Sequence, residues 1–327
     1  MNGRKVLVTG AAGQIASPIC EHLATTNEVW GLDLFPLVGS RERLEGIGVT
    51  TWAGDVASGI FSGLPDDFDY VIHLAAYLAP DHDYDAALRV NAEGTGLLLS
   101  HCRSARGALV MSSVGVYEPV PDPWHEFRES DALGDAHSPY VPTYGVTKIA
   151  QEAVARTCAR VFDLPVVIAR MNTAYGPNGG MPAHHLDAII EGRDVTVRHD
   201  PMPANPIYQQ DINTQVEALL AAACVPAPVV NWGGDEVVTQ QEWCAHLGEL
   251  TERPARVVLH PEGKRRGGAV DVGRRREITG PCAVDWREGM RLMVEGRYPD
   301  GPDGRRIAGA GAAHALDAYE RRESPAS

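Results

Sequence analysis

The chain has 327 residues, 44% of them hydrophobic, and a formal net charge of −14 at pH 7. This length and composition predict a globular protein with a full α/β core and two lobes, and they exclude a disordered chain. The acidic balance, without a basic arm, argues against a nucleic-acid partner. The sequence has no run of about 18 apolar residues, so we expect no membrane span.

A strand is expected almost at the first residue, which leaves no room for a signal peptide, so we expect a cytoplasmic protein. The cysteines are scattered without a CxxC pair, and we interpret them as reduced packing residues. The six positions are Cys20, Cys102, Cys158, Cys224, Cys244 and Cys282.

A glycine-rich turn follows the first predicted strand, residues 5–9. The segment Thr9-Gly10-Ala11-Ala12-Gly13-Gln14-Ile15-Ala16 leads from that strand into a helical pattern that reaches about Ala24. Backbone N–H groups and the positive end of a helix bind a pyrophosphate at such a turn. A second strand, 28–32, ends at Asp33, whose carboxylate can accept both ribose hydroxyls and repels a 2′-phosphate. The pattern therefore favours NAD over NADP.

Three further strands are predicted at 49–53, 69–74 and 108–112, with a helix at 84–102. Asp55, after the third strand, meets the adenine or caps the following turn; the sequence leaves both open. His73 is expected to be a core histidine held by hydrogen bonds, and the small residues that follow it let a cofactor lie across the sheet. Asn91 is expected to hydrogen-bond backbone near the cofactor, or to be an ordinary helix-face amide.

The segment Tyr144-Gly145-Val146-Thr147-Lys148 opens a helical pattern that runs to Val161. On a helix starting at about Thr143, Tyr144 and Lys148 lie four residues apart and share one face. An ammonium beside a phenol favours the phenolate, so we expect Lys148 to lower the pKa of Tyr144 from about 10. The alternative is a surface lysine near a tyrosine, and the surrounding motifs decide between the two.

The second half of the chain alternates between sheet strands and a separate lobe. A strand is predicted at 165–171, a helix at 211–224 and a returning strand at 229–231. The lobe is expected to hold a helix at 239–251, whose Thr239 and Glu242 form a capping box, a strand at 256–259 and a helix at 286–294. Residues 300–327 are expected to be a mobile tail with a marginal helix at 312–322.

The predicted fold is a doubly wound parallel α/β sheet of the Rossmann type with a smaller, interleaved C-terminal substrate lobe. The NAD-binding domain is expected at 1–177 plus about 206–232, and the substrate-binding lobe at about 178–205 plus 233–299. The long segment 118–142 is either a lid over the substrate or an ordered surface loop. His184 and His185 are adjacent and face different ways on a helix, so no metal site is expected.

The motifs together resemble the extended short-chain dehydrogenase/reductase family, its NAD-dependent epimerase/dehydratase group. The resemblance covers about residues 4–296. It rests on motifs that occur in order along the chain: Thr9-Gly10-x-x-Gly13-x-x-Ala16, Asp33, Asp55-Val56, His73-Leu74-Ala75-Ala76, Asn91, Ser112-Ser113 with Tyr117, Tyr144-x-x-x-Lys148, and Arg170 to Tyr175-Gly176-Pro177.

The resemblance implies a catalytic set of Ser113, Tyr144 and Lys148, in which the tyrosine exchanges a proton with a substrate hydroxyl and the serine orients the substrate oxygen. It also implies a homodimer paired through the helices at 84–102 and 143–161. The residues expected at NAD are Gly10, Gly13, Gln14, Ile15, Asp33, Asp55, Val56, Leu74, Ala75, Ala76, Asn91, Tyr144 and Lys148. Those expected at the substrate are Tyr77, Thr173, Arg265 and Arg266.

Two positions depart from the family pattern. Thr173 stands where many relatives have an asparagine that contacts a nucleotide sugar, and Ala204-Asn205 replaces an Arg-Asp pair whose arginine grips the diphosphate. Loss of that arginine removes a bidentate phosphate partner. The basic run 264–266 either replaces it or is a solvated cluster.

The sequence therefore predicts an NAD-dependent oxidoreductase or epimerase that transfers hydride at a carbinol carbon of a hydroxylated, sugar-like substrate, of the nucleotide-sugar epimerase type. One alternative is a net NAD-dependent dehydrogenase or reductase that acts on a non-nucleotide alcohol or ketone. A second is a catalytically silent NAD-binding protein. Dehydration is disfavoured, because dehydratase relatives carry an acidic pair where this chain has Val114-Gly115.

Overall fold

The computed structural model describes residues 1–134, 141–261 and 267–304. Arg265, Arg266 and all but the first five residues of the predicted tail, 300–327, lie outside the described residues. Within them the main element is a seven-stranded parallel sheet of order β11-β6-β5-β4-β1-β2-β3. Its strands are β1 (Lys5–Thr9), β2 (Glu28–Asp33), β3 (Thr50–Ala53), β4 (Tyr70–His73), β5 (Gly107–Ser113), β6 (Val166–Met171) and β11 (Val229–Trp232).

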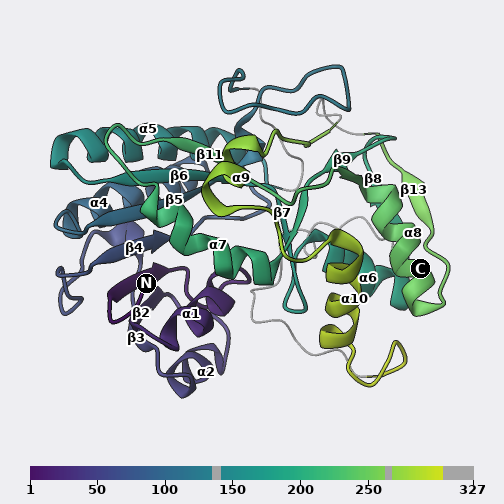
Figure 1. Ribbon diagram of the computed structural model, residues 1–327, viewed down its shortest axis with the longest axis horizontal. Helices are drawn as coiled ribbons and strands as arrows, with labels where there is room; N and C mark the ends of the chain where they lie inside the picture. The colour runs from purple at the N-terminus through teal and green to yellow at the C-terminus, as the bar shows by residue number, and fades with distance from the viewer. Residues whose placement is uncertain (135–140, 262–266, 305–327) are drawn as a thin grey trace.

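The helices cover both faces of this sheet, which confirms the doubly wound prediction. Figure 1 shows α5 on one side and α1 with α7 on the other. The central strands are apolar on both faces because each face packs on helices. One side carries α1 (Ala16–Ala24), α2 (Ser40–Gly46), α7 (Gln209–Ala221) and α9 (Gly273–Thr279), and the other α3 (Tyr84–Leu88), α4 (Gly94–His101) and α5 (Tyr144–Phe162).

The strand order reverses between β1 and β4, which lie side by side in parallel register. In open α/β sheets, ligands bind outside the carboxyl ends of the strands at such a switch point. The predicted helix at 84–102 is interrupted between α3 and α4 by a π-helical stretch, Arg89–Glu93, which contains Asn91. Single π-helical turns inside α-helices are frequent at functional sites.

A second hydrophobic cluster lies apart from the sheet and is centred on α6 (Met181–Ile190), α8 (Gln240–Thr251) and α10 (Trp286–Arg297). Thr239 caps α8 with Glu242 in the predicted capping box. Three small sheets accompany this part of the chain. They pair β7 (Thr173–Tyr175) with β10 (Pro206–Tyr208), β9 (Pro203–Ala204) with β12 (Val238–Thr239), and β8 (Val195–Val197) with β13 (Val257–Leu259). Figure 1 shows β8, β9 and β13 at the right and β7 near the middle.

The described part of the long loop, 118–134, is anchored at several points. Phe127 pairs with Val270 in a parallel bridge, and its ring stacks on Tyr117 at 4.9 Å between centroids. Asn231, at the end of the sheet, accepts a hydrogen bond from the Tyr117 hydroxyl and donates to the Phe127 carbonyl. These contacts favour the ordered loop over the lid for residues 118–134; residues 135–140 lie outside the described part.

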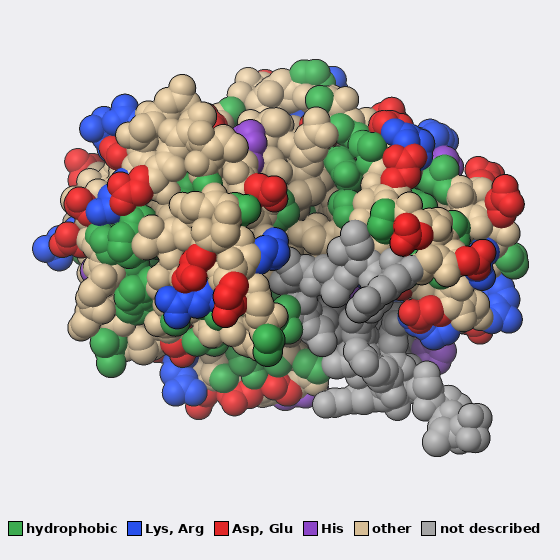
Figure 2. Space-filling model, turned by 90° about the horizontal axis from the view of Figure 1, so that it is seen from below, with side chains coloured by type: hydrophobic (Ala, Val, Ile, Leu, Met, Phe, Trp, Pro, Cys, Tyr) green, Lys and Arg blue, Asp and Glu red, His purple; other side chains and the backbone are tan. Residues whose placement is uncertain are grey.

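The surface carries both signs of charge. Figure 2 shows acidic and basic side chains interspersed over one face of the molecule. Among the described residues, no helix combines the length and the apolar character that crossing a membrane requires.

Candidate active site

The carboxyl ends of the parallel strands bring most of the predicted site residues to one edge of the sheet. Gly10 and Gly13 follow β1, Asp33 ends β2, and Ser113 ends β5. Leu74, Ala75 and Ala76 follow β4, and Thr173 comes two residues after β6. Sequence spacing alone could only suggest this convergence, because the strands come from distant parts of the chain.

The glycine turn approaches the chain after β4 so closely that a side chain does not fit. Gly10 has a φ of +65°, and a Cβ there would lie 3.0 Å from both the Cα and the nitrogen of Ala75. A Cβ on Gly13 would lie 2.9 Å from the Gly10 carbonyl oxygen. Both positions therefore require glycine, and the turn leaves its backbone open to a ligand.

Asp33 is oriented by the turn in front of it. Its carboxylate accepts hydrogen bonds from the Ala12 and Phe35 backbone N–H groups, each at 3.0 Å. The first contact ties the end of β2 to the glycine turn. The carboxylate is only partly buried, so it can still accept ligand hydroxyls.

Gln14 and Ile15 connect the glycine turn to the second part of the chain. The Gln14 amide donates to the Ala174 carbonyl at 3.3 Å, and the Gln209 amide donates to the Ile15 carbonyl at 3.2 Å. Asn178 donates to the Gln14 carbonyl. These hydrogen bonds tie the glycine turn to the segments that follow β6 and β10.

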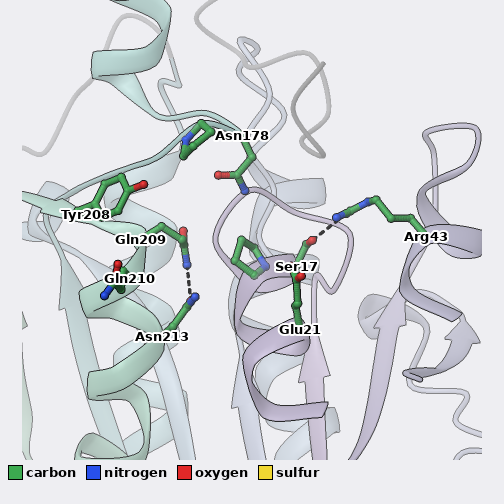
Figure 3. A pocket seen from close by; sticks show the side chains of 10 residues that line it. Ser17, Glu21, Arg43, Asn178, Tyr208, Gln209, Gln210 and Asn213 are labelled. Atoms are coloured by element: carbon green, nitrogen blue, oxygen red, sulfur yellow. Dashed lines mark hydrogen bonds between the residues drawn. The ribbon is translucent and has the colours of Figure 1, made fainter. Parts of the chain in front are cut away.

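Next to this junction lies an open hollow of about 450 Å³ between α1 and the start of α7. Figure 3 shows Ser17 and Glu21 of α1, Gln209 and Asn213 of α7, and Arg43, whose guanidinium donates to the Ser17 hydroxyl. No residue predicted to be catalytic or to bind cofactor or substrate lines this hollow.

Asp55 caps a short 3₁₀ helix, Val56–Ser58, by accepting a hydrogen bond from the Ala57 N–H at 2.8 Å. The capping alternative is therefore confirmed, and the contact with adenine stays a prediction. His73 is fully buried, and its two ring nitrogens contact the Thr9 hydroxyl at 2.7 Å and the Thr95 hydroxyl at 2.8 Å. Burial lowers the pKa of His73 to about 3, which confirms a neutral core histidine.

The Asn91 side chain forms a hydrogen bond with the backbone, as predicted. Its side-chain oxygen accepts from the Tyr77 N–H at 2.7 Å, and its amide donates to the Thr147 hydroxyl at 2.9 Å. The π-helical stretch thus joins the segment after β4 to the first turn of α5. The Tyr77 hydroxyl donates to Asp81, which raises the tyrosine's pKa to about 12.

Ser113, Tyr144 and Lys148 lie together at the start of α5. The Ser113 hydroxyl contacts Tyr144 and also accepts from the Gly115 N–H at 3.0 Å. The Lys148 Nζ lies 5.4 Å from the centroid of the Tyr144 ring. The neighbouring Ser112 is different, because it is fully buried and donates to Glu152 at 2.6 Å.

The expected lowering of the Tyr144 pKa by Lys148 is wrong for this structure. Burial raises the pKa of Tyr144 to about 12, and only the Ser113 hydrogen bond opposes that shift. The ammonium donates instead to the Met111 carbonyl and the Gln151 side chain, each at 2.9 Å. Burial lowers the pKa of Lys148 itself to about 7, with Glu152 acting against the shift.

Two polar residues of α5 beside Lys148 were missed by sequence reasoning. Glu152 forms a buried bidentate ion pair with Arg170 of β6, with both N–O distances at 2.8 Å. Gln151 bonds Lys148 directly. The sequence did offer a signal for them, because both residues lie on the predicted helix three and four positions after the lysine, where side chains are neighbours on the helix surface.

Of the four residues predicted to bind the substrate, the structure describes Tyr77 and Thr173. The Thr173 hydroxyl donates to the Asn172 side chain at 3.1 Å and is half-buried. Ala204 pairs with Val238 in a small sheet, and Asn205 is buried with its side chain bonded to the Gly234 carbonyl and the Val270 N–H. Arg265 and Arg266 lie outside the described residues.

Neither histidine of the 184–185 pair belongs to a cluster of metal ligands in the described part of the chain. His185 is buried and accepts from the Trp243 indole at 2.9 Å. Its burial lowers the pKa to about 3. The histidine is therefore a core residue of the second hydrophobic cluster.

Comparison with known proteins gives consistent matches. A sequence model described as the NAD dependent epimerase/dehydratase family matches residues 6–202. An uncharacterized UDP-glucose epimerase of Bacillus subtilis is 27% identical over 284 residues, which cover 80% of this chain and 86% of that protein. A dTDP-glucose 4,6-dehydratase of Neisseria gonorrhoeae is 26% identical over 334 residues, which cover 89% and 95% of the two chains.

Among solved structures, the UDP-glucuronic acid 4-epimerase of Bacillus cereus, in complex with UDP-glucuronic acid and NAD, superposes with a TM-score of 0.76. The match covers 88% of this chain and 97% of the epimerase, at 23% identity. At that identity, the likeness establishes the shared fold.

Proposed function

Because the chain belongs to the NAD dependent epimerase/dehydratase family, we propose that it catalyses an epimerase-type reaction at a carbinol carbon of a nucleotide sugar. The observation that carries this proposal is the contact set of Ser113, Tyr144 and Lys148 at the carboxyl edge of the sheet. The relatives support the substrate class, since their names specify UDP- and dTDP-linked sugars.

The residues present fit NAD. Gly10 and Gly13 form a turn whose backbone has no room for a Cβ, as close approach to a pyrophosphate requires. Asp33, held by the Ala12 N–H, presents a carboxylate at the end of β2, where a ribose would bind. Leu74, Ala75 and the other residues predicted at NAD remain part of this proposal.

Within this site, bound NAD supplies the hydride chemistry. Tyr144 would take the proton of the substrate hydroxyl, and would return it to the same oxygen when the ketone, turned over in the site, is reduced on its opposite face. Ser113 donates to the substrate oxygen and stabilises charge that develops there. Lys148 would hold the nicotinamide ribose through its ammonium, and a cation beside a phenol favours the phenolate.

Dehydration is disfavoured by the segment after Ser113. Elimination of water needs an acid and a base beside the serine. Here Val114–Val116 forms a 3₁₀ helix of apolar residues and glycine. An epimerase or a net dehydrogenase needs no such pair.

A net dehydrogenase or reductase acting on a non-nucleotide alcohol or ketone is the second candidate, and it is favoured by Ala204. This residue is buried in a two-stranded sheet and offers no charge to a diphosphate. Asn205 is equally committed to internal hydrogen bonds. Thr173, with Tyr77, is proposed to contact the substrate under either candidate.

Three further expectations belong to the proposal. The two-domain division, 1–177 plus about 206–232 against about 178–205 plus 233–299, is supported by the cluster of α6, α8 and α10, but α9 within the second segment packs against α7 and β11 of the sheet. A homodimer through the helices at 84–102 and 143–161 is supported by the exposure of Leu97 on α4 and of Val146 and Val161 on α5. The location is expected to be the cytoplasm.

The first experiment is to denature the purified protein and to identify any released nicotinamide by absorbance and mass. Resident NAD, with interconversion of UDP- or dTDP-sugars, supports the epimerase. A protein that binds NAD weakly and oxidises free alcohols or sugars supports the second candidate.

Tyr144→Phe is the variant that tests the proposed role of the tyrosine hydroxyl. It should reduce turnover by about 10²–10⁴-fold while NAD still binds. A wild-type protein that binds NAD but turns over no sugar or alcohol would support the silent NAD-binding alternative. A protein that binds neither NAD nor NADP would refute the proposed site.

A further inference from the structure

The Lys148 ammonium is held in a buried site by two acceptors. The residue is 1% exposed, and its Nζ donates to the Met111 carbonyl and to the Gln151 Oε1, each at 2.9 Å. An ammonium has three N–H donors. Among the described residues, no protein group accepts the third, so it can serve a ligand.

Gln151 is itself fixed by a buried chain of hydrogen bonds. Its Nε2 donates to the Thr95 hydroxyl at 3.0 Å, and that hydroxyl contacts the His73 Nε2 at 2.8 Å. The His73 Nδ1 in turn contacts the Thr9 hydroxyl at 2.7 Å. Thr9, His73, Thr95 and Gln151 are all fully buried.

The proton positions in this chain are determined by the contacts. The Thr9 hydroxyl accepts from the Leu74 and Ala75 N–H groups, so its own hydrogen goes to the His73 Nδ1. The neutral imidazole then carries its hydrogen on Nε2 and donates to Thr95.

Thr95 also accepts from the Gln151 amide and donates to the Asn91 carbonyl at 2.8 Å. The amide of Gln151 can therefore present only its oxygen to Lys148. A flipped amide would place an N–H group against the ammonium.

The charged and titratable groups that face Lys148 come from three elements. On α5 these are the Tyr144 ring and Glu152, and on β4 the neutral His73. Arg170 of β6 is paired with Glu152 and offsets its charge. Gln151 supplies the side-chain oxygen that bonds the ammonium directly, and a hydrogen bond to the charged form of a group favours that form.

We propose that Gln151 is a positioning residue that keeps the Lys148 ammonium charged and aimed into the site, by linking it through Thr95 and His73 to the glycine turn. This deepens the proposed function, since a neutral or displaced amine could not hold a cofactor ribose. The effect on Lys148 itself does not require that function to be correct.

The chain contains only three lysines, Lys5, Lys148 and Lys264, so lysine labelled with ¹³C at Cε gives three signals. Lys148→Arg assigns one of them. We expect the Lys148 signal to titrate near neutral pH in the wild-type protein. Gln151→Met, which keeps the shape and removes the acceptor, should lower that midpoint by about one to two pKa units.

Two variants control the measurement. Gln215→Met removes another buried glutamine, one that bonds Trp232 and lies away from Lys148, and should leave the Lys148 midpoint unchanged. Gln151→Glu places a carboxylate beside the ammonium and should raise the midpoint. It also tests the proposal if the methionine variant fails to fold.

The affinity for NAD, measured by calorimetry across pH, is the second readout. It should fall as pH rises through the Lys148 midpoint, and the profile should move to lower pH in Gln151→Met and back up in Gln151→Glu. If the Lys148 midpoint stays within about 0.3 units of wild type in both Gln151 variants, or moves equally in Gln215→Met, the proposal is overturned. If the midpoint shifts as expected but NAD does not bind, the positioning role stands and the proposed function fails.

Discussion

Replacing Arg170 by methionine should destabilise the protein strongly, because it leaves the Glu152 carboxylate buried without its cation. Arg170 and Glu152 are 1% and 3% exposed at the side chain, and two N–O contacts of 2.8 Å join them. Removing one partner of a buried pair costs about 3–5 kcal/mol, whereas an exposed helical i,i+4 pair contributes about 0.3–0.5 kcal/mol. We therefore expect Arg170→Met to lower the free energy of unfolding by about 3–5 kcal/mol.

The exposed pair Arg41–Glu45 on α2 is the matched control, since its side chains are 48% and 46% exposed. Arg41→Met should change the free energy of unfolding by less than about 0.5 kcal/mol. Urea unfolding, followed by tryptophan fluorescence and circular dichroism, measures both variants.

The double variant Glu152→Met/Arg170→Met tests the cause of the loss. It removes the unpaired charge, so it should recover at least about 2 kcal/mol relative to Arg170→Met, although the Ser112 hydroxyl loses its acceptor. If Arg170→Met costs no more than Arg41→Met, or if the double variant is less stable than Arg170→Met, the reasoning from burial is refuted.

Three further predictions concern the glycine turn, the cofactor and pH. Gly10→Ala should abolish measurable NAD binding in calorimetry. The control is Gly3→Ala, because Gly3 also has a positive φ, +63°, but no atom lies within 4 Å of the new Cβ, so NAD binding should stay intact. Equal effects of the two substitutions would contradict the close-approach argument. Asp33→Asn should weaken NAD and improve NADP binding, because it removes the charge that repels a 2′-phosphate; an unchanged ratio of the two dissociation constants would count against the ribose contact. His73 and His185 have folded-state pKa values of about 3, below the ordinary 6.5, so the unfolded state binds more protons between these values. Stability should therefore fall as pH drops below about 6.5, by about 1.4 kcal/mol per pH unit for each histidine. Replacing each by glutamine should reduce that slope in urea unfolding, and an unaltered slope would mean that the histidines titrate normally when folded.

Local patterns in the sequence were sufficient for much of the fold. Short apolar runs predicted the seven strands of the main sheet within one residue at each end, and Thr239 with Glu242 marked the start of α8. The four-residue spacing of Tyr144 and Lys148 placed both on one helix, which the structure begins at Tyr144. These features depend on period and on neighbouring residues, which are properties of the chain itself.

Several short elements could not be predicted from such patterns. The two-residue strands β9 and β12 exist only because distant segments pair with each other. The π-helical stretch around Asn91 arises where the helix meets both the segment after β4 and α5. Anchoring of 118–134 likewise depends on Asn231, about a hundred residues away.

At the site, too, some features could be predicted from the sequence and others depended on the tertiary structure. The residue types of the glycine turn, Asp33, Ser113, Tyr144 and Lys148 were readable from the sequence, because their spacing along strands and a helix is regular. Only the tertiary structure decided the direction of the Tyr144 pKa, the acceptors of the Lys148 ammonium and the part played by Gln151. The reason is physical: a pKa and a hydrogen-bond partner depend on burial and on atoms that the packing of α5 against β5 brings within about 3 Å.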